Sequence, residues 1–151
     1  MEMTNKKDYA IIKDVEVGED TKIYDQVNLY RCKIGKSSKI DAFVYIEEDV
    51  IIGNYCKIRP FVFIPTGVTI GDRVFIGPGV MFTNDKYPKC EGKWELLETI
   101  VEDNVSIGAG AVILPGIKIG KGALIGAGAV VTKNIPPGAT VLGNPGRLRK
   151  D

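Results

Sequence analysis

Aliphatic residues return at every sixth position along most of this 151-residue chain. One register begins at Ile34, is interrupted after Phe82 and resumes at Val101. Its members are Ile34, Ile40, Ile46, Ile52, Ile58, Ile64, Ile70, Ile76, Phe82, Val101, Ile107, Ile113, Ile119, Ile125 and Val131. Two residues before most of these anchors stands another small or apolar residue, as in the pair Val44 and Ile46. A spacing of two places both side chains on one face of an extended strand, whereas an amphipathic helix needs a period of about 3.6.

Glycine often follows the anchor directly, at Gly35, Gly53, Gly71, Gly77, Gly108, Gly120 and Gly126. Glycine at that place suits a corner that needs unusual backbone angles. Each hexad is therefore expected to form a short strand with two inward side chains, followed by a turn. Hexapeptide periodicity of this kind indicates a parallel β-helix. We predict one all-β domain over residues 1–151, with a protruding loop at about 83–100 and a short C-terminal tail, the repeat ending near Ile135.

Composition argues against several classes of function. A net charge of +1 with 26% charged residues gives no polyanion-binding signature, so we expect neither a nucleic-acid partner nor a membrane partner. Three cysteines without metal-ligand spacing are expected to be reduced thiols, which places the protein in the cytoplasm. The chain has no histidine, so a zinc site would have almost no ligands, and we expect no metal.

The hexads resemble those of the hexapeptide-repeat acyltransferases over residues 15–145. The stretch Phe82-Thr83-Asn84-Asp85-Lys86-Tyr87-Pro88 is similar to a loop of N-acetyltransferases that act on nucleotide-linked amino sugars for surface-polysaccharide biosynthesis. The ending Gly143-Asn144-Pro145 resembles the same group. The resemblance implies a left-handed β-helix with three hexads per triangular coil, a homotrimer, and acetyl-CoA as co-substrate in clefts between subunits. It also implies a nucleotide sugar as the other substrate.

Three hexads per coil assign the outward residues to three faces. One face carries Tyr45, Phe63 and Met81, with Phe43 and Phe61 beside them, and is expected to continue through Val112 and Val130. The other two present Lys39, Lys57 and Phe75, and Lys33, Ile51 and Thr69. An apolar face of this extent favours a homotrimer seam, although a flat solenoid face that tolerates exposed aromatic residues is the alternative.

Acyl transfer from a thioester needs an uncharged nucleophile, a site for the tetrahedral oxyanion and a proton for the leaving thiolate. Most of the resembled family uses a histidine base, and this chain has none. A hydroxyl acceptor suffers most from that loss, because a fraction of an amine is already neutral near pH 7. The missing base therefore favours N-acetylation over O-acetylation, and the resembled enzymes include members thought to work without a protein base.

Asn84 is the first candidate catalytic residue, because its amide oxygen can accept a hydrogen bond from an amine and orient the lone pair. Asp85 is the second, as a weak base or an orienting carboxylate. Local turn formation is the alternative role for both residues. Tyr87 and Trp94 can stack on a sugar or base, or simply pack the loop.

The candidate cofactor-binding residues are small or basic. The corners Gly108-Ala109 and Gly126-Ala127 lie one coil apart on one edge, where a pantetheine arm can approach the backbone, and an amide near Gly108 can serve as an oxyanion donor. Turn geometry alone is the alternative reason for these glycines. The basic residues that can meet the CoA phosphates are Lys133, Arg147, Arg149 and Lys150, and a solvated basic tail explains the last three equally well.

Two other functions stay open. A sugar O-acetyltransferase is disfavoured by the absent base, and a non-catalytic trimeric scaffold or binding module is what an inactivated relative would be. The γ-class carbonic anhydrases use a similar repeat but need three zinc-binding histidines, so that function is excluded.

Overall fold

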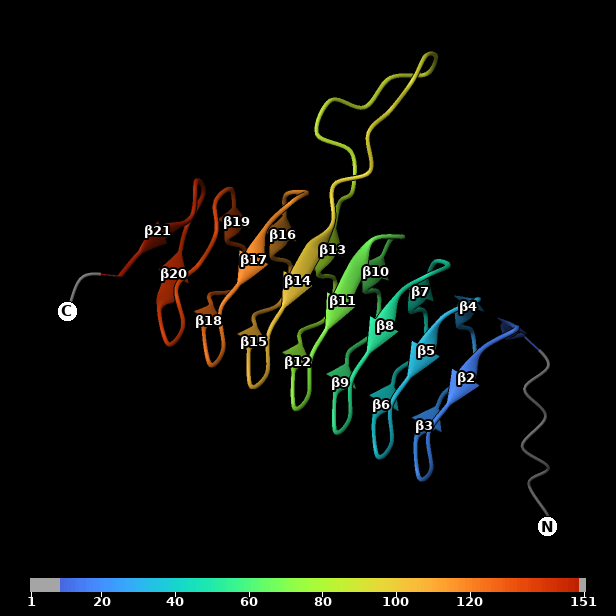
Figure 1. Ribbon diagram of the computed structural model, residues 1–151. Coiled ribbons are helices and arrows are strands. Elements are labelled where there is room, and N and C mark those ends of the chain that lie inside the picture. Colours follow the sequence, from blue (N-terminus) through green and yellow to red (C-terminus); the bar gives the residue numbers. More distant parts are fainter. Residues whose placement is uncertain (1–8, 150–151) are drawn as a thin grey trace, which may run out of the picture.

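The computed structural model describes residues 9–149 and shows three parallel sheets that form the sides of a prism (Figure 1). Sheet A contains β1 (Ile11–Lys13), β4 (Asn28–Tyr30), β7 (Tyr45–Ile46), β10 (Phe63–Ile64), β13 (Met81–Phe82), β16 (Val112–Ile113) and β19 (Val130–Val131). Sheet B contains β2 (Glu16–Val17), β5 (Lys33–Ile34), β8 (Ile51–Ile52), β11 (Val68–Ile70), β14 (Thr99–Val101) and β17 (Lys118–Ile119). Sheet C contains β3 (Lys22–Ile23), β6 (Lys39–Ile40), β9 (Lys57–Ile58), β12 (Phe75–Ile76), β15 (Ser106–Ile107), β18 (Leu124–Ile125), β20 (Thr140–Leu142) and β21 (Arg147–Leu148).

From β1 to β16, each strand pairs with the strand three positions later, so three hexads make one coil. Tyr45 lies beside Phe63, and Phe63 beside Met81, a register of 18 residues per coil. The arrangement is that of the predicted left-handed parallel β-helix, and the fold prediction is confirmed. Over residues 9–149 there is no helix with the length and apolar character needed to cross a bilayer.

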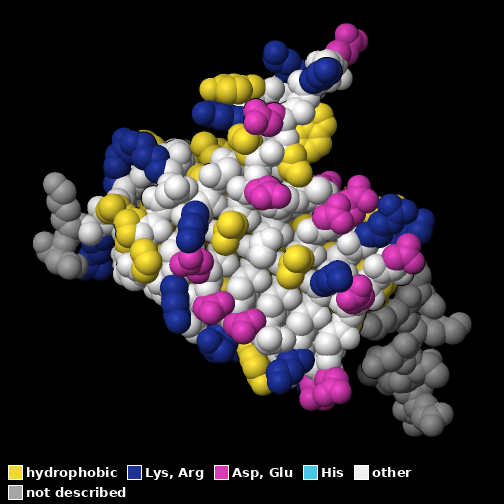
Figure 2. All heavy atoms as spheres, in the orientation of Figure 1, with side chains coloured by type: hydrophobic (Ala, Val, Ile, Leu, Met, Phe, Trp, Pro, Cys, Tyr) yellow, Lys and Arg dark blue, Asp and Glu magenta, His cyan; other side chains and the backbone are white. Residues whose placement is uncertain are grey.

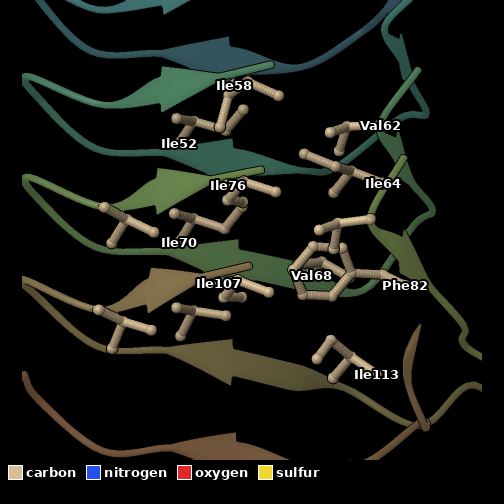
Figure 3. Close-up of a cluster of buried hydrophobic side chains, with 14 of the residues drawn as sticks. Ile52, Ile58, Val62, Ile64, Val68, Ile70, Ile76, Phe82, Ile107 and Ile113 are labelled. Carbon is tan, nitrogen blue, oxygen red and sulfur yellow. The ribbon is translucent and has the colours of Figure 1, made fainter. Parts of the chain in front are cut away.

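The core consists of columns of identical or similar side chains stacked along the prism. Figure 3 shows one column of Ile58, Ile76 and Ile107 and another of Ile64, Phe82 and Ile113, each fully buried. Burying a residue of this size contributes roughly 1.5–3 kcal/mol relative to leaving it exposed. Because each anchor stacks on the equivalent residue of the next coil, the sixfold sequence period becomes a continuous hydrophobic interior.

Glycine is needed directly after the anchors for a different structural reason from the one we expected. None of these glycines has a positive φ; the left-handed conformation occurs two residues later, for example at Ser37 (φ 53°), Tyr55 (φ 57°) and Arg73 (φ 54°). Instead, a Cβ atom at Gly108 would lie 2.5 Å from the backbone nitrogen of Ala127 in the next coil. The glycines therefore permit close stacking of the coils, and the strained corner angle is adopted by other residues.

The protruding loop leaves the prism between β13 and β14, at the corner between sheets A and B (Figure 1). Met81 pairs with Val112, a step of 31 residues where an ordinary coil has 18, so the loop adds 13 residues. The loop ends at residue 98, because β14 already begins at Thr99.

The C-terminal end of the stack extends further than the sequence predicted. Ile135 forms a parallel bridge with Ile119, and β20 continues sheet C, burying Val141 in the core. The antiparallel strand β21 then folds back on β20 and ends the prism.

The predicted grouping of outward residues on sheet A is confirmed by strand register, with Tyr45, Phe63, Met81, Val112 and Val130 in one row. Tyr45 is 40% exposed and Met81 41% exposed. At the neighbouring corner between sheets C and A, the Phe43 and Phe61 rings are stacked with centroids 4.9 Å apart. Sheet A is therefore an apolar face of the described chain.

Candidate active site

The base of the loop holds Asn84 in a fixed orientation. Asn84 follows β13 and is half-buried, and its side-chain Nδ2 donates a hydrogen bond to the Thr66 carbonyl at 3.1 Å. The backbone carbonyl of Asn84 accepts a hydrogen bond from the Leu97 amide at 3.1 Å, which closes the neck of the loop. Because a carbonyl can only accept, the amide nitrogen of Asn84 must face Thr66, which leaves Oδ1 free to accept from another group.

Asp85, the second candidate, takes part in local turn structure. Its Oδ1 accepts a hydrogen bond from the Tyr87 amide at 2.9 Å, as an Asx turn does. The turn role and a role in chemistry are compatible, because a carboxylate has a second oxygen and several acceptor sites. Asp85 itself is half-buried.

A hollow of about 700 Å³ lies between the loop and the prism, beside Asn84. Its lining residues are Tyr30, Tyr45, Glu47, Glu48, Thr66, Asn84, Asp85, Tyr87, Lys89, Cys90, Glu91, Gly92, Lys93, Trp94 and Leu96. Figure 2 shows hydrophobic side chains gathered around the base of the loop. The prism wall supplies Glu47 and Glu48, and the loop supplies Lys89, Lys93 and Trp94. We call this hollow the upper pocket.

A second hollow, of about 610 Å³, lies on the C-terminal side of the loop base. It is lined by Thr83, Asp85, Lys86, Pro88, Leu97, Leu114, Pro115, Gly116, Ile117, Thr132, Lys133 and Asn134. We call it the lower pocket, and Asp85 borders both pockets. A further hollow of about 550 Å³ adjoins Lys133 and includes Arg147, so the structure brings these two predicted cofactor residues together. Arg149 is exposed, and Lys150 lies outside the described residues.

The predicted glycine–alanine corners lie away from Asn84 in the same chain. Gly108-Ala109 and Gly126-Ala127 stack one coil apart, as predicted, with the Gly128 amide donating to the Ala109 carbonyl at 2.8 Å. They form the corner between sheets C and A, whereas Asn84 lies at the corner between sheets A and B. The amide of Gly108 itself already donates to the Ile125 carbonyl at 2.7 Å, so an oxyanion donor at this corner would have to be a neighbouring amide.

Sequence reasoning missed the prism wall of the upper pocket. Glu47 and Thr66 come from coils that precede Asn84 by two turns and one turn, and Tyr30 lies one coil before Glu47. The signal in the sequence was an acidic residue directly after an inward anchor, Ile46. That signal becomes meaningful only when the 18-residue coil length places Glu47 near the base of the loop.

The family described as bacterial transferase hexapeptide (six repeats) matches residues 31–66 and 98–133, on both sides of the loop. A curated relative, the 2,3,4,5-tetrahydropyridine-2,6-dicarboxylate N-acetyltransferase of Staphylococcus aureus, is 49% identical over 51 residues. That match covers 34% of this chain and 21% of the relative, so the chain spans about a fifth of the length of such relatives.

Solved structures share the fold over most of the chain. A variant of GDP-perosamine N-acetyltransferase from Caulobacter crescentus, in complex with CoA and GDP-perosamine, superimposes with a TM-score of 0.69 and 21% identity, covering 95% of this chain and 54% of that one. A variant of AntD, an N-acyltransferase from Bacillus cereus in complex with dTDP and coenzyme A, gives a TM-score of 0.70 and 22% identity, covering 89% and 82%. The chain thus carries hexapeptide repeats of the bacterial transferase type on both sides of the loop, and its coil architecture is shared with solved acetyltransferases, as the resemblance implied.

Proposed function

We propose that this protein transfers an acetyl group from acetyl-CoA to the amine of a nucleotide-linked amino sugar, without a histidine base. The observation that carries the proposal is the fixed amide of Asn84, which lines the upper pocket and is followed by Asp85, the residue that borders both pockets at the loop base. The activities and ligands of the structural relatives, N-acyl transfer with CoA and a nucleotide or nucleotide sugar, support the same reaction class.

The upper pocket suits the amino sugar. Its prism wall carries the carboxylates of Glu47 and Glu48, which can accept hydrogen bonds from the polar groups of a sugar, while Lys89 and Lys93 on the loop suit phosphate groups. Trp94 and Tyr87, from the same loop, offer flat apolar surfaces to a sugar or base.

The lower pocket and the adjoining hollow suit the acyl carrier. Lys133 borders both hollows, and Arg147 borders the second, so two cationic side chains are available to bind the phosphates of CoA. No group of three or more metal-ligating side chains is found among residues 9–149, and the proposed reaction uses none.

The chemistry follows from the free acceptor atom on Asn84. Oδ1 accepts a hydrogen bond from the neutral sugar amine and directs its lone pair toward the thioester carbon. The C–N bond forms as the C–S bond breaks, and the proton lost from nitrogen goes to the departing CoA thiolate. Asp85 has one oxygen engaged in its turn, and its second oxygen can orient the amine or receive this proton transiently.

The apolar sheet A face is proposed as the seam of a homotrimer through Tyr45, Phe63 and Met81. A cyclic interface is heterologous, so one edge of sheet A in each copy faces the opposite edge in the next. That packing would bring the Gly108-Ala109 and Gly126-Ala127 corners of one copy toward Asn84 of its neighbour. The cofactor role of these corners therefore depends on the assembly.

A thiol-release assay tests the proposed function. Purified protein is given acetyl-CoA and a panel of UDP-, dTDP- and GDP-linked amino sugars, with the matching hydroxyl sugars as controls. We expect CoA release with at least one amino sugar and none with its hydroxyl counterpart. Release with hydroxyl sugars alone would instead establish the O-acetyltransferase.

The scaffold alternative is tested by binding. Titration calorimetry should show saturable binding of CoA if the lower pocket and the adjoining hollow form the CoA site. A protein that neither binds CoA nor releases thiol with any acceptor would be a non-catalytic solenoid. The surface-polysaccharide role and the cytoplasmic location stay predictions from the sequence.

A further inference from the structure

Three consecutive coils are linked by two hydrogen bonds that end at Asn84. The Glu47 Oε2 atom accepts from the Thr66 amide at 3.0 Å, and the Thr66 carbonyl accepts from Asn84 Nδ2 at 3.1 Å. Glu47 follows β7, Thr66 follows β10 and Asn84 follows β13, so all three lie at the corner between sheets A and B (Figure 1). All three also line the upper pocket.

From this arrangement we propose that Glu47 is a positioning residue, which acts on Asn84 through the backbone of Thr66. The inference rests on the proposed function, since it assigns Glu47 a part in the same site. The role of Glu47 is to orient another side chain. Glu47 holds Thr66 in place, and the Thr66 carbonyl determines which atom of the Asn84 amide faces the acceptor amine.

The orientation of an asparagine amide is set by its partners. If Asn84 lost the Thr66 carbonyl, its amide could turn by half a rotation and present NH₂ in place of oxygen to the pocket. An amine that must keep its lone pair for the thioester needs an acceptor beside its N–H, and an NH₂ group cannot fill that place. One lost hydrogen bond at Thr66 therefore affects catalysis more than stability.

Thr66 needs a restraint at this corner. Its neighbours are Pro65, which has no N–H, and Gly67, which has a φ of 93° and the conformational freedom of glycine. The Glu47 backbone is itself held, because its amide donates to the Ile64 carbonyl at 3.0 Å. A hydrogen bond to a carboxylate is stronger than one between neutral groups, so Glu47 is a firm support for the Thr66 amide.

The chain offers a matched control. Glu102 Oε2 accepts from the Lys121 amide at 2.8 Å, a carboxylate-to-backbone bond between adjacent coils like that of Glu47. Glu102 lies at the corner between sheets B and C, away from the loop. Replacing Glu102 removes the same kind of bond, together with an ion pair to Lys118 Nζ at 2.7 Å, without touching the Asn84 site.

The kinetic test compares Glu47→Ala, Glu47→Gln and Glu102→Ala. We expect Glu47→Ala to lower kcat about 10-fold or more, because misorientation of a reacting group is costly, with little change in the KM for acetyl-CoA. Glu47→Gln keeps an acceptor oxygen and should recover most of the rate, and Glu102→Ala should match the wild type. Unchanged kcat in Glu47→Ala, or an equal loss in Glu102→Ala, would overturn the proposal.

A double-mutant cycle separates positioning from direct contact with substrate. If Glu47 acts through Asn84, then Glu47→Ala should have almost no further effect in an Asn84→Ala background, as is usual for residues that work as a unit. Additive losses would show that Glu47 acts by another route, and the positioning role would be rejected.

A spectroscopic test of the link between Glu47 and Asn84 does not require an active enzyme. In ¹⁵N-labelled protein, Glu47→Ala should speed hydrogen exchange of the Thr66 amide and shift the Asn84 side-chain NH₂ signals, and Glu102→Ala should leave both unchanged. Wild type that transfers no acetyl group would reject the proposed function, yet altered Asn84 signals would still support the link. Unaltered Asn84 signals in Glu47→Ala would reject the link whether or not the enzyme is active.

Discussion

Asn84 and Thr66 are 18 residues apart in sequence and joined by a hydrogen bond of 3.1 Å between Asn84 Nδ2 and the Thr66 carbonyl. The separation equals one coil, so the contact exists because the loop-bearing coil stacks in register on the coil before it. An asparagine that only shaped its turn would bond within its own loop. Here its side chain is tied to the rigid prism through Nδ2, which leaves Oδ1 free to accept from another group, and the residue lines the upper pocket.

Asn84→Ala should reduce kcat for acetyl transfer by about 100-fold, because the acceptor amine loses the group that orients it. Steady-state kinetics with a saturating amino sugar measure the change. Asn104→Ala is the matched control, since Asn104 is exposed at another corner and its Oδ1 accepts from Arg73 Nε at 2.9 Å. A wild-type rate in Asn84→Ala would remove this residue from the mechanism.

Gly108→Ala should destabilise the fold independently of any cofactor. The added Cβ would meet the Ala127 nitrogen at 2.5 Å, and overpacking of this kind costs about 1–3 kcal/mol. Gly110→Asn is the control: Gly110 has a φ of 68° with open space around its Cβ position, and asparagine tolerates that conformation. Chemical denaturation compares the two, and equal free energies of unfolding would contradict the stacking role of Gly108.

Phe63→Glu should break the proposed trimer, because a carboxylate would be buried in an apolar seam without a partner. Light scattering after size-exclusion chromatography should report a fall from three times the chain mass to one. Ile51→Glu places the same charge on sheet B, where Ile51 is exposed, and should leave the mass unchanged. If both variants behave alike, the seam does not lie on sheet A.

Stability should fall at alkaline pH because of two core thiols. Burial raises the pKa of the Cys32 thiol from 9.0 to about 11, and burial also raises the pKa of Cys56. The folded state therefore holds both thiols neutral, while the unfolded chain ionises from about pH 9 upward, so the free energy of unfolding is unaffected below that pH and decreases between about 9 and 11.

Denaturant titrations at pH 8 and at higher pH measure how the free energy of unfolding depends on pH. The double variant Cys32→Ala, Cys56→Ala should lose the part of this pH dependence that comes from the two thiols. The double variant starts from a lower stability, because it leaves small cavities in the core. A slope that persists unchanged in the double variant would assign the alkaline loss to other groups.

The sequence alone determined the coil, because the sixfold period of inward residues leaves few ways to bury them. It also determined which outward residues share sheet A, since a constant coil length fixes the neighbours of Tyr45 and Phe63. The loop was predictable as a break in register, and Asn84 as a residue at its base. These features are local or periodic, and periodic features need no knowledge of distant contacts.

Tertiary structure decided what distant residues do to one another. The glycines after the anchors proved to serve close stacking, because the clash they avoid is with the next coil and not within their own turn. The stack continued past Ile135 to Val141, where pairing with β18 replaces a clear sequence repeat. Glu47 reached Asn84 only through Thr66, a link across three coils that depends on hydrogen-bond geometry, and a one-dimensional pattern does not encode that geometry.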